Sequence, residues 1–444
     1  MTHRSAPLFG EFCRYASLNM LGMAGLSCYI LADTFFVARG LGQAGLTALN
    51  LAIPFYNLIH GCGLMLGMGG AIRYSILKSQ GSREAGGRLF GSLCRLGGLL
   101  AAVFVLAGLF FSRPLAALTG ADPEVFEMTR TYLRVLLLFS PAFLANDLVL
   151  CFVRNDGAPQ LATLAMVAGS LSNILLDILF IFGLGWGIFG AVFATGLAPL
   201  LSLAVLSRHF WGGRCGFGPR RGWIGGRAAL SCLGLGFPSL VTEFSSGAVI
   251  VAFNYLFLAL EGNVGVAAYG VITNLSLVVV ALFTGLAQGA QPLVSRARGQ
   301  NRPDQARRVL GYGLGTVLLL SVALYALIAL KAQALAGLFN GEGDPLLQRI
   351  AEEGLRLYFL GTGFAGCNIL FSLYFAASER ALPAHLISLA RGLFLILPLA
   401  FLMARWGGTR GVWLTWPLTE LLTLFLALFF LCRKRRAKPA PCAE

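Results

Sequence analysis

The sequence predicts an all-α polytopic membrane protein, with twelve transmembrane helices arranged as two six-helix bundles. Composition is the first reason, because 57% of the 444 residues are hydrophobic and only 12% are charged, at a mean hydropathy of +0.76. A soluble domain carries about 25% charged residues. The length of the apolar runs and a repeat within the chain are the second and third reasons.

Twelve apolar runs are long enough to cross a bilayer core of about 30 Å. They begin near residues 12, 46, 90, 131, 161, 187, 229, 266, 309, 354, 384 and 411. Each run is expected to be a helix, because only helices and closed barrels satisfy the backbone polar groups in lipid. The first run follows a short polar start and lacks an A-x-A-like cleavage site, so we expect a retained helix.

Basic loops alternate with acidic or short loops, which predicts the orientation of the chain. The basic residues lie after the second, sixth and eighth runs and in the tail, and include Lys78, Arg83, Arg88, Arg208, Arg214, Arg220, Arg221, Arg227, Arg296, Arg298, Arg302, Arg307, Arg308, Arg433, Lys434, Arg435, Arg436 and Lys438. The acidic residues lie after the third and ninth runs, and include Asp122, Glu124, Glu127, Glu342, Asp344, Glu352 and Glu353. By the positive-inside rule both termini are expected in the cytoplasm.

The net charge of +15 is therefore interpreted as a topology signal, which also favours contact with anionic membrane lipids. No nucleic-acid partner is expected. Most of the ten cysteines lie within apolar runs and form no C-x-x-C, which indicates small buried hydrophobes rather than disulfides or metal ligands. The chain has no H-E-x-x-H, no P-loop and no G-x-S-x-G, so no enzyme, metal centre or cofactor is expected.

The chain repeats itself at an offset of 220 to 222 residues. Matched pairs include Gly45 with Gly265, Ala48 with Ala268, Arg134 with Arg356, Asn146 with Asn368, Gly187 with Gly408 and Gly190 with Gly411. We interpret the repeat as two halves of six helices, related by an axis along the membrane normal. The predicted segments are a first bundle (1–210), a basic cytoplasmic linker (211–228), a second bundle (229–432) and a basic cytoplasmic tail (433–444).

Four polar residues inside the apolar runs of the first half form the candidate ion-coupling site: Asp33, Asn173, Asp177 and Thr195. At 1.5 Å per residue, the two acids and the threonine lie at matched depths, roughly 6 to 12 Å from the outer boundary. Two carboxylates that meet away from water cannot both ionise cheaply, so the pair would carry an exchangeable proton. The amide and hydroxyl oxygens could also help to hold Na⁺, and the residues alone leave H⁺ and Na⁺ open. Hydrogen bonding between helices is the alternative role.

Glu243 lies in mid-membrane, five residues after Pro238, at the start of the second half. It is a candidate counter-charge for a cationic substrate or a second proton site, and the alternative is an ion pair with a buried arginine. Arg391 and Glu420 form a candidate structural ion pair between the eleventh and twelfth helices. The repeat places Phe253 opposite Asp33, so the two halves are expected to have different roles.

Six segments carry a resemblance to a known family. They are DTFFVARGLG (33–42), FVRNDGAPQ (152–160), SNILLDILFIFGLGWGIFGAVFAT (172–195), TEFSSG (242–247), AYGVITNL (268–275) and AQGAQPLVSRARG (287–299). With them the chain resembles the multidrug and toxic compound extrusion (MATE) family. The resemblance implies two bundles around a cavity and export of organic, often cationic, compounds against inward H⁺ or Na⁺. It also implies that Asp33, Asn173, Asp177 and Thr195 match the cation site of some members, and Glu243 the important acid of others.

Two departures from the family pattern concern coupling. Residues 16–37 contain no proline, whereas some members kink their first helix with one. Residues 355–377 contain no acid, whereas some sodium-coupled members have an aspartate there. The second departure favours H⁺ over Na⁺.

The sequence therefore predicts a secondary active multidrug exporter of a bacterial inner membrane, which works by alternating access. We expect a monomer that needs only its coupling ion. The alternative is a flippase for lipid-linked oligosaccharide or peptidoglycan precursors, but its cavity should be cationic to hold pyrophosphate, and the mid-membrane residues here are mostly acids. A channel or receptor is a third possibility.

Overall fold

Helices make up nearly all of the computed structural model, which describes residues 8–211, 215–218, 222–340 and 343–433. In the first half they are α1 (Leu8–Ser79), α2 (Arg83–Phe110), α3 (Ser112–Leu118), α4 (Pro123–Leu138), α5 (Ser140–Asn155), α6 (Pro159–Asp177), the π-helix η1 (Ile178–Gly183), α7 (Gly187–Leu206) and α8 (Arg208–Trp211). In the second half they are α9 (Gly226–Gly299), α10 (Pro303–Leu330), α11 (Ala332–Phe339), α12 (Pro345–Tyr358), the 3-10 helix η2 (Phe359–Gly361), α13 (Thr362–Ala377), α14 (Ala381–Leu389), the π-helix η3 (Ala390–Phe394) and α15 (Ile396–Cys432). No strand occurs in the described part of the chain.

Three long helical stretches each contain a sharp break at a glycine. Gly42 in α1 (φ 67°), Gly262 in α9 (φ 64°) and Gly408 in α15 (φ 54°) adopt a backbone conformation that side chains rarely tolerate. Within the described residues, eight helical stretches are long and apolar enough to span a membrane, and α4 with α5, bent by 47°, makes a ninth. Division at the three glycines gives the twelve spans that the sequence predicts.

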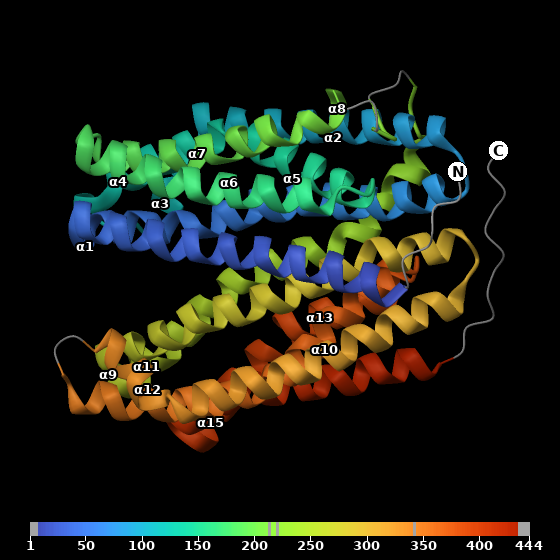
Figure 1. Ribbon diagram of the computed structural model, residues 1–444. Helices are drawn as coiled ribbons and strands as arrows, with labels where there is room; N and C mark the ends of the chain where they lie inside the picture. Colours follow the sequence, from blue (N-terminus) through green and yellow to red (C-terminus); the bar gives the residue numbers. More distant parts are fainter. Residues whose placement is uncertain (1–7, 212–214, 219–221, 341–342, 434–444) are drawn as a thin grey trace.

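The backbone repeats at the same offset as the sequence. Residues with positive φ recur in pairs that are 220 to 222 positions apart: Gly42 with Gly262, Gly81 with Asn301, Gly157 with Glu379, and Gly187 with Gly408. The two halves form two bundles, α1 to α8 above and α9 to α15 below in Figure 1. The predicted fold class is therefore confirmed. The segment boundaries at 210, 228 and 432 stay predictions, and Arg214, Arg220, Arg221, Glu342 and residues 434–444 lie outside the described residues.

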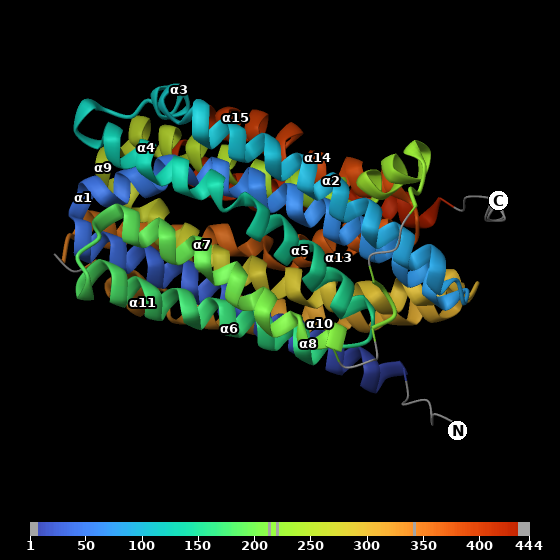
Figure 2. The same ribbon diagram turned by 90° about the horizontal axis from the view of Figure 1, so that it is seen from above.

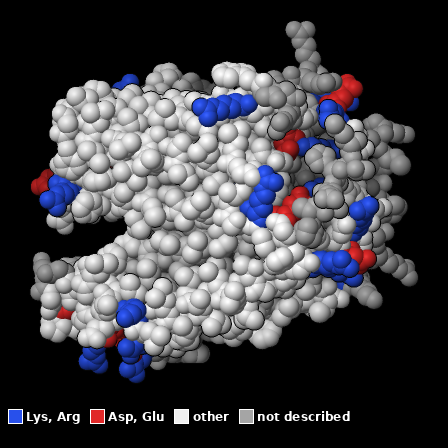
Figure 3. Space-filling view, viewed as in Figure 1, with Lys and Arg blue, Asp and Glu red and all other residues white. Residues whose placement is uncertain are grey.

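The two bundles meet at one end of the molecule and diverge at the other. The closed end holds the start of α1 and the finish of α15, as both ribbon views show (Figures 1 and 2). The open end holds the break at Gly42, and a cleft separates the bundles there (Figure 3). On the face in view, charged side chains gather mainly toward the two ends, and the surface between them is largely uncharged.

Glycines bring the backbones of the two bundles into direct contact at the closed end. A β-carbon on Gly69 would lie 1.9 Å from the carbonyl oxygen of Cys232, and one on Gly236 would lie 1.9 Å from that of Met65. These contacts join residues 43–79 of α1 to residues 226–261 of α9. Close approach of this kind is typical of small residues at helix interfaces in membranes.

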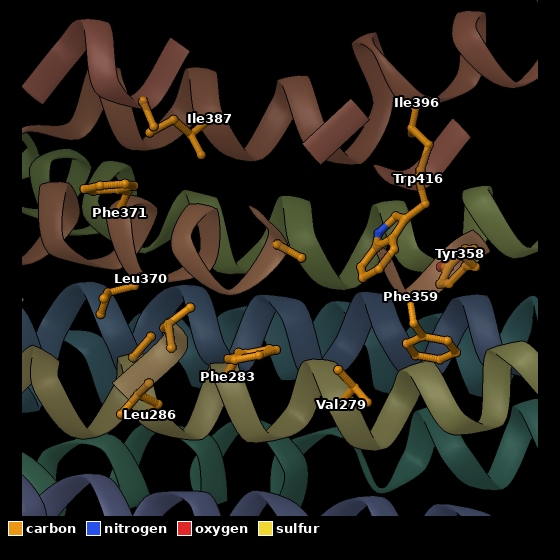
Figure 4. Packing of buried hydrophobic residues seen from close by; sticks show 14 of the residues in the cluster. Val279, Phe283, Leu286, Tyr358, Phe359, Leu370, Phe371, Ile387, Ile396 and Trp416 are labelled. Atoms are coloured by element: carbon orange, nitrogen blue, oxygen red, sulfur yellow. The ribbon is translucent and has the colours of Figure 1, made fainter. Parts of the chain in front are cut away.

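Aromatic and branched side chains fill the second bundle, as Figure 4 shows. The rings of Tyr358 and Trp416 stack with centroids 4.5 Å apart. Phe283 of α9 lies in the same cluster as Phe371 of α13.

Candidate functional site

The four polar residues of the candidate ion-coupling site lie together inside the first bundle. Asp33 belongs to α1, nine residues before the break at Gly42, so the site is near the open end. Asn173 and Asp177 lie one turn apart on α6, and both are fully buried, while Thr195 of α7 is 5% exposed. The expected meeting of helices one, five and six is therefore present, and a role in ion coupling stays a prediction.

A hydrogen-bonded network joins the four side chains. With the Asn173 amide oriented so that both of its polar atoms find partners, the nitrogen donates to Asp177 Oδ2 over 3.1 Å and the oxygen accepts from the backbone N–H of Thr195 over 3.3 Å. The Asp33 and Asp177 carboxyl groups approach each other closely enough to share a hydrogen bond when one of them carries a proton. Such a bond needs a proton on one of the two groups, because an ionised carboxylate only accepts. The cluster can therefore hold one exchangeable proton.

A π-helical turn shapes the chain beside this cluster. The α-helical part of α6 ends at Asp177, and η1 runs from Ile178 to Gly183. Such turns are rare in proteins, and many of those that occur lie at functional sites. The hydrophobic pattern does not predict this turn, because one extra residue in a hydrogen-bonded helical ring leaves no clear hydrophobic period.

Two tyrosines, Tyr29 and Tyr132, also lie beside the acidic cluster, and the sequence pattern does not identify them as site residues. The Tyr132 hydroxyl of α4 lies beside the side chain of Thr195. Tyr29 lies one helical turn before Asp33, and its hydroxyl is 2.9 Å from that of Tyr56. The spacing of one helical turn places Tyr29 on the same helix face as Asp33 and could have predicted their proximity. Nothing in the sequence links Tyr132 to Thr195.

Glu243 lies outside this cluster, where the second bundle contacts the first. A β-carbon on Gly61 would lie 3.1 Å from Glu243 Cβ. The charged neighbours of Glu243 are His60 and Asp147 of the first bundle. Among the described residues no arginine forms an ion pair with Glu243, so the structure does not support the alternative of a buried arginine partner.

Arg391 and Glu420 form an ion pair inside the second bundle. Arg391 of η3 donates from Nη2 to Glu420 Oε1 over 2.7 Å and from Nε over 3.1 Å. Asn368 of α13 donates to the other carboxylate oxygen over 2.7 Å. The side chains of the pair are 11% and 2% exposed, and with Asn368 they connect three spans. A structural role for the pair stays a prediction.

A family model for MatE matches the chain twice, over residues 19–179 and 238–402. The chain belongs to the MatE family. The two matches cover one half each, which agrees with the repeat of the backbone. Members of this family are ion-coupled transporters rather than enzymes and need no cofactor, and the chain is an integral membrane protein of this kind.

Relatives and solved structures of the MATE family resemble the chain over nearly its whole length. An FAD transporter of Shewanella oneidensis is 26% identical, with 97% of this chain and 95% of the relative covered. The multidrug export protein MepA of Staphylococcus saprophyticus is 23% identical, with 91% of this chain and 89% of the relative covered. A multidrug resistance MATE transporter of the MOP superfamily, solved in an outward-facing conformation, has a TM-score of 0.89 at 22% identity, with 97% of each chain covered. At that identity the likeness supports the fold alone.

Proposed function

We propose that this protein is a secondary active exporter of a bacterial inner membrane, which moves small organic cations outward in exchange for inward H⁺. The observation that carries the proposal is the buried contact between the Asp33 and Asp177 carboxyl groups. Burial of a carboxyl group in hydrocarbon costs free energy, so two carboxyl groups in contact there indicate a functional site. One proton shared between them removes a charge from the membrane, so uptake and release of that proton can be linked to a change of conformation.

The oxygen atoms around the acids favour H⁺ over Na⁺. The Asn173 amide oxygen already accepts from the Thr195 backbone, and the Thr195 hydroxyl donates to the Ala191 carbonyl over 3.1 Å. A sodium ion prefers several free oxygen ligands. Among the buried side-chain oxygens of these four residues, Asp33 Oδ1 and Asp177 Oδ1 lack a donor, and two such oxygens suit a proton better than a coordinated metal cation.

Alternating access is supported by the shape of the molecule. The bundles are closed where α1 starts and open at the opposite end (Figures 1 and 3). The positive-inside rule places the termini in the cytoplasm, so this conformation opens to the outside. Export then requires the closed end to separate and the open end to close. We propose a monomer, because the cleft lies between the two halves of one chain.

The charge of the cleft region favours a cationic substrate. Glu243 of α9 is an acid in mid-span, where the second bundle contacts the first. A dinucleotide such as FAD, which the relative from Shewanella oneidensis is named for, or a lipid pyrophosphate carries negative charge and would need basic partners. Export of FAD and binding of lipid pyrophosphate are therefore the two competing outcomes to measure beside cation export.

The decisive experiment compares ethidium efflux from energised cells that express wild type, Asp177→Asn or Asp122→Asn. Asparagine cannot carry the shared proton, so we expect Asp177→Asn to reduce efflux to the level of empty-vector cells. Asp122 is an exposed acid at the open end, and its variant is the matched control that should export normally. Collapse of the proton gradient alone should stop wild-type efflux, whereas collapse of the sodium gradient should not. Full activity of Asp177→Asn would contradict the assigned site.

A further inference from the structure

A histidine and an aspartate form a second polar cluster in the first bundle, apart from the Asp33–Asp177 pair. His60 of α1 has its Nδ1 atom 2.9 Å from Asp147 Oδ2 of α5. The imidazole stacks on Tyr56, with ring centroids 5.9 Å apart and an angle of 14° between the rings. Asp147 lies against Gly63, where a β-carbon would be only 2.4 Å from Oδ2. The missing side chain of Gly63 thus makes room for a buried carboxyl group.

The second bundle brings another acid to the same histidine. Glu243 of α9 packs on Gly61, next to His60 in the chain, and its charge acts on the imidazole. His60 therefore has one acid from its own bundle and one from the other bundle. This contact lies at the junction that must change when the bundles move.

Two tyrosines and an arginine also lie near this cluster. Tyr29 and Tyr56, whose hydroxyls are 2.9 Å apart, are electrostatic neighbours of Asp147. Arg154, two turns further along α5, donates to Gln288 Oε1 over 2.7 Å and so is already engaged with the second bundle. Tyr29 also adjoins Asp33, so the tyrosine pair connects the two acidic sites.

Asp147 is almost completely buried, at 4% exposure, and lacks a full set of donors. The short contact with His60 is not aligned as a hydrogen bond, and among the described residues no other donor reaches Oδ2. A buried carboxylate with so few donors is costly, so its charge must be compensated by a cationic His60 or removed by its own proton. Either solution places one proton on the His60–Asp147 pair.

We propose that His60 and Asp147 form a second proton-binding site, whose occupancy depends on the approach of Glu243 from the other bundle. With the bundles closed around it, His60 is held between two acids and keeps its proton. When the closed end separates and Glu243 withdraws, one negative charge is removed and the proton is released. This inference rests on the proposed proton-coupled export and adds a second proton to each exchange cycle.

The first test measures the ratio of protons taken up to ethidium exported in proteoliposomes. We expect His60→Gln and Asp147→Asn to retain export but to lower the ratio by about half, because one of two proton sites is lost. His385→Gln is the matched control, since this histidine contacts the Gly234 carbonyl in the second bundle and lies outside the proposed site. An unchanged ratio in both site variants would overturn the proposal.

The second test does not depend on export. The chain has only four histidines, so the purified protein with isotope-labelled histidine gives few NMR signals, and His60→Gln assigns the one of interest. We expect Glu243→Gln to lower the fraction of protonated His60 at a given pH, because it removes a facing negative charge. A His60 titration that is identical in wild type and Glu243→Gln would refute the inference even if export is proton-coupled. Failure of ethidium export with a Glu243-dependent titration would instead refute only the proposed function.

Discussion

Asp156 shows how one buried carboxylate fixes the start of the linker between the bundles. It follows α5 and accepts hydrogen bonds from His209 Nε2 over 2.7 Å, the Gly216 N–H over 2.7 Å and the Tyr74 hydroxyl over 2.6 Å. Lys78 forms an ion pair with the same carboxylate. Asp156, His209 and Cys215 are close enough to hold a metal ion, but the lysine and three donors already occupy the carboxylate oxygens.

The pKa of Asp156 predicts the pH dependence of stability at this position. Burial raises the pKa, but the hydrogen bonds from His209, Gly216, Lys78 and Tyr74 outweigh it and lower the pKa from 3.8 to about 2. Since the folded pKa is the lower one, the stabilisation is present above about pH 4 and is lost as the pH falls toward about 2. We expect Asp156→Asn to destabilise by at most about 2 kcal/mol at neutral pH, and by less at pH near 3.

Thermal unfolding of the purified protein in detergent measures this difference. Asp122→Asn, at an exposed acid, should unfold like wild type at both pH values. A gap between wild type and Asp156→Asn that does not narrow on acidification would show that the carboxylate charge is not the stabilising feature.

At the scale of residues, the sequence was informative where polarity stands out against an apolar background. Asp33, Asp177 and Glu243 were identifiable because each interrupts a hydrophobic run. Tyr132 and His60 were not, since a tyrosine is common in membrane helices and a histidine gains its meaning from the partner it meets. Contacts between different helices depend on helix rotation, which spacing along the chain does not determine.

At the scale of elements, the twelve apolar runs predicted the spans, but not how consecutive spans are joined. Gly42, Gly262 and Gly408 turn the chain without a loop, so each joins two spans that a count by secondary structure alone would merge. The π-helices η1 and η3 have no signature in the hydrophobic pattern. Backbone conformation at single residues thus positions the site more finely than hydropathy can indicate.

The contact at Gly236 makes a prediction about the closed end. A β-carbon there would lie 1.9 Å from the Met65 carbonyl, so Gly236→Ala must push α9 away from α1. Overpacking of this kind costs about 1 to 3 kcal/mol, which lowers the ratio of closed to separated conformations by about 5- to 150-fold. We expect the initial rate of ethidium efflux to fall by about tenfold. Gly234→Ala is the control, because its β-carbon would meet nothing within 4 Å, and an equal loss in both variants would contradict the steric argument.

At the scale of the whole molecule, polar contacts lock the closed end across the two bundles. Arg296 of α9 holds Glu11 of α1 through two hydrogen bonds of 2.7 and 2.6 Å. The side-chain amides of Asn155 and Gln291 donate to each other over 3.0 and 3.1 Å. The repeat predicted two bundles, but no feature of the sequence predicted which end is closed. The two conformations of a transporter differ by only a few kcal/mol, so small differences in such contacts decide between them.

The Glu11–Arg296 pair offers a test of this lock by charge exchange. Arg296→Glu places two acids together at the closed end, so we expect the closed population to fall and the open tips of the bundles to approach each other. The double variant Glu11→Arg with Arg296→Glu should restore the wild-type distribution, because the attraction returns with reversed sign. Both side chains are partly exposed, at 26% and 40%, so the restored coupling will be modest and weakened by salt.

Spin labels at Glu124→Cys and Leu346→Cys report the distance between the open tips of the bundles, once the exposed native cysteines are replaced. These two exposed positions are 222 residues apart, at the starts of α4 and α12. If the double variant resembles the single one, the pair does not hold the bundles together, and the apolar and glycine contacts of α1 with α9 must be sufficient for closure.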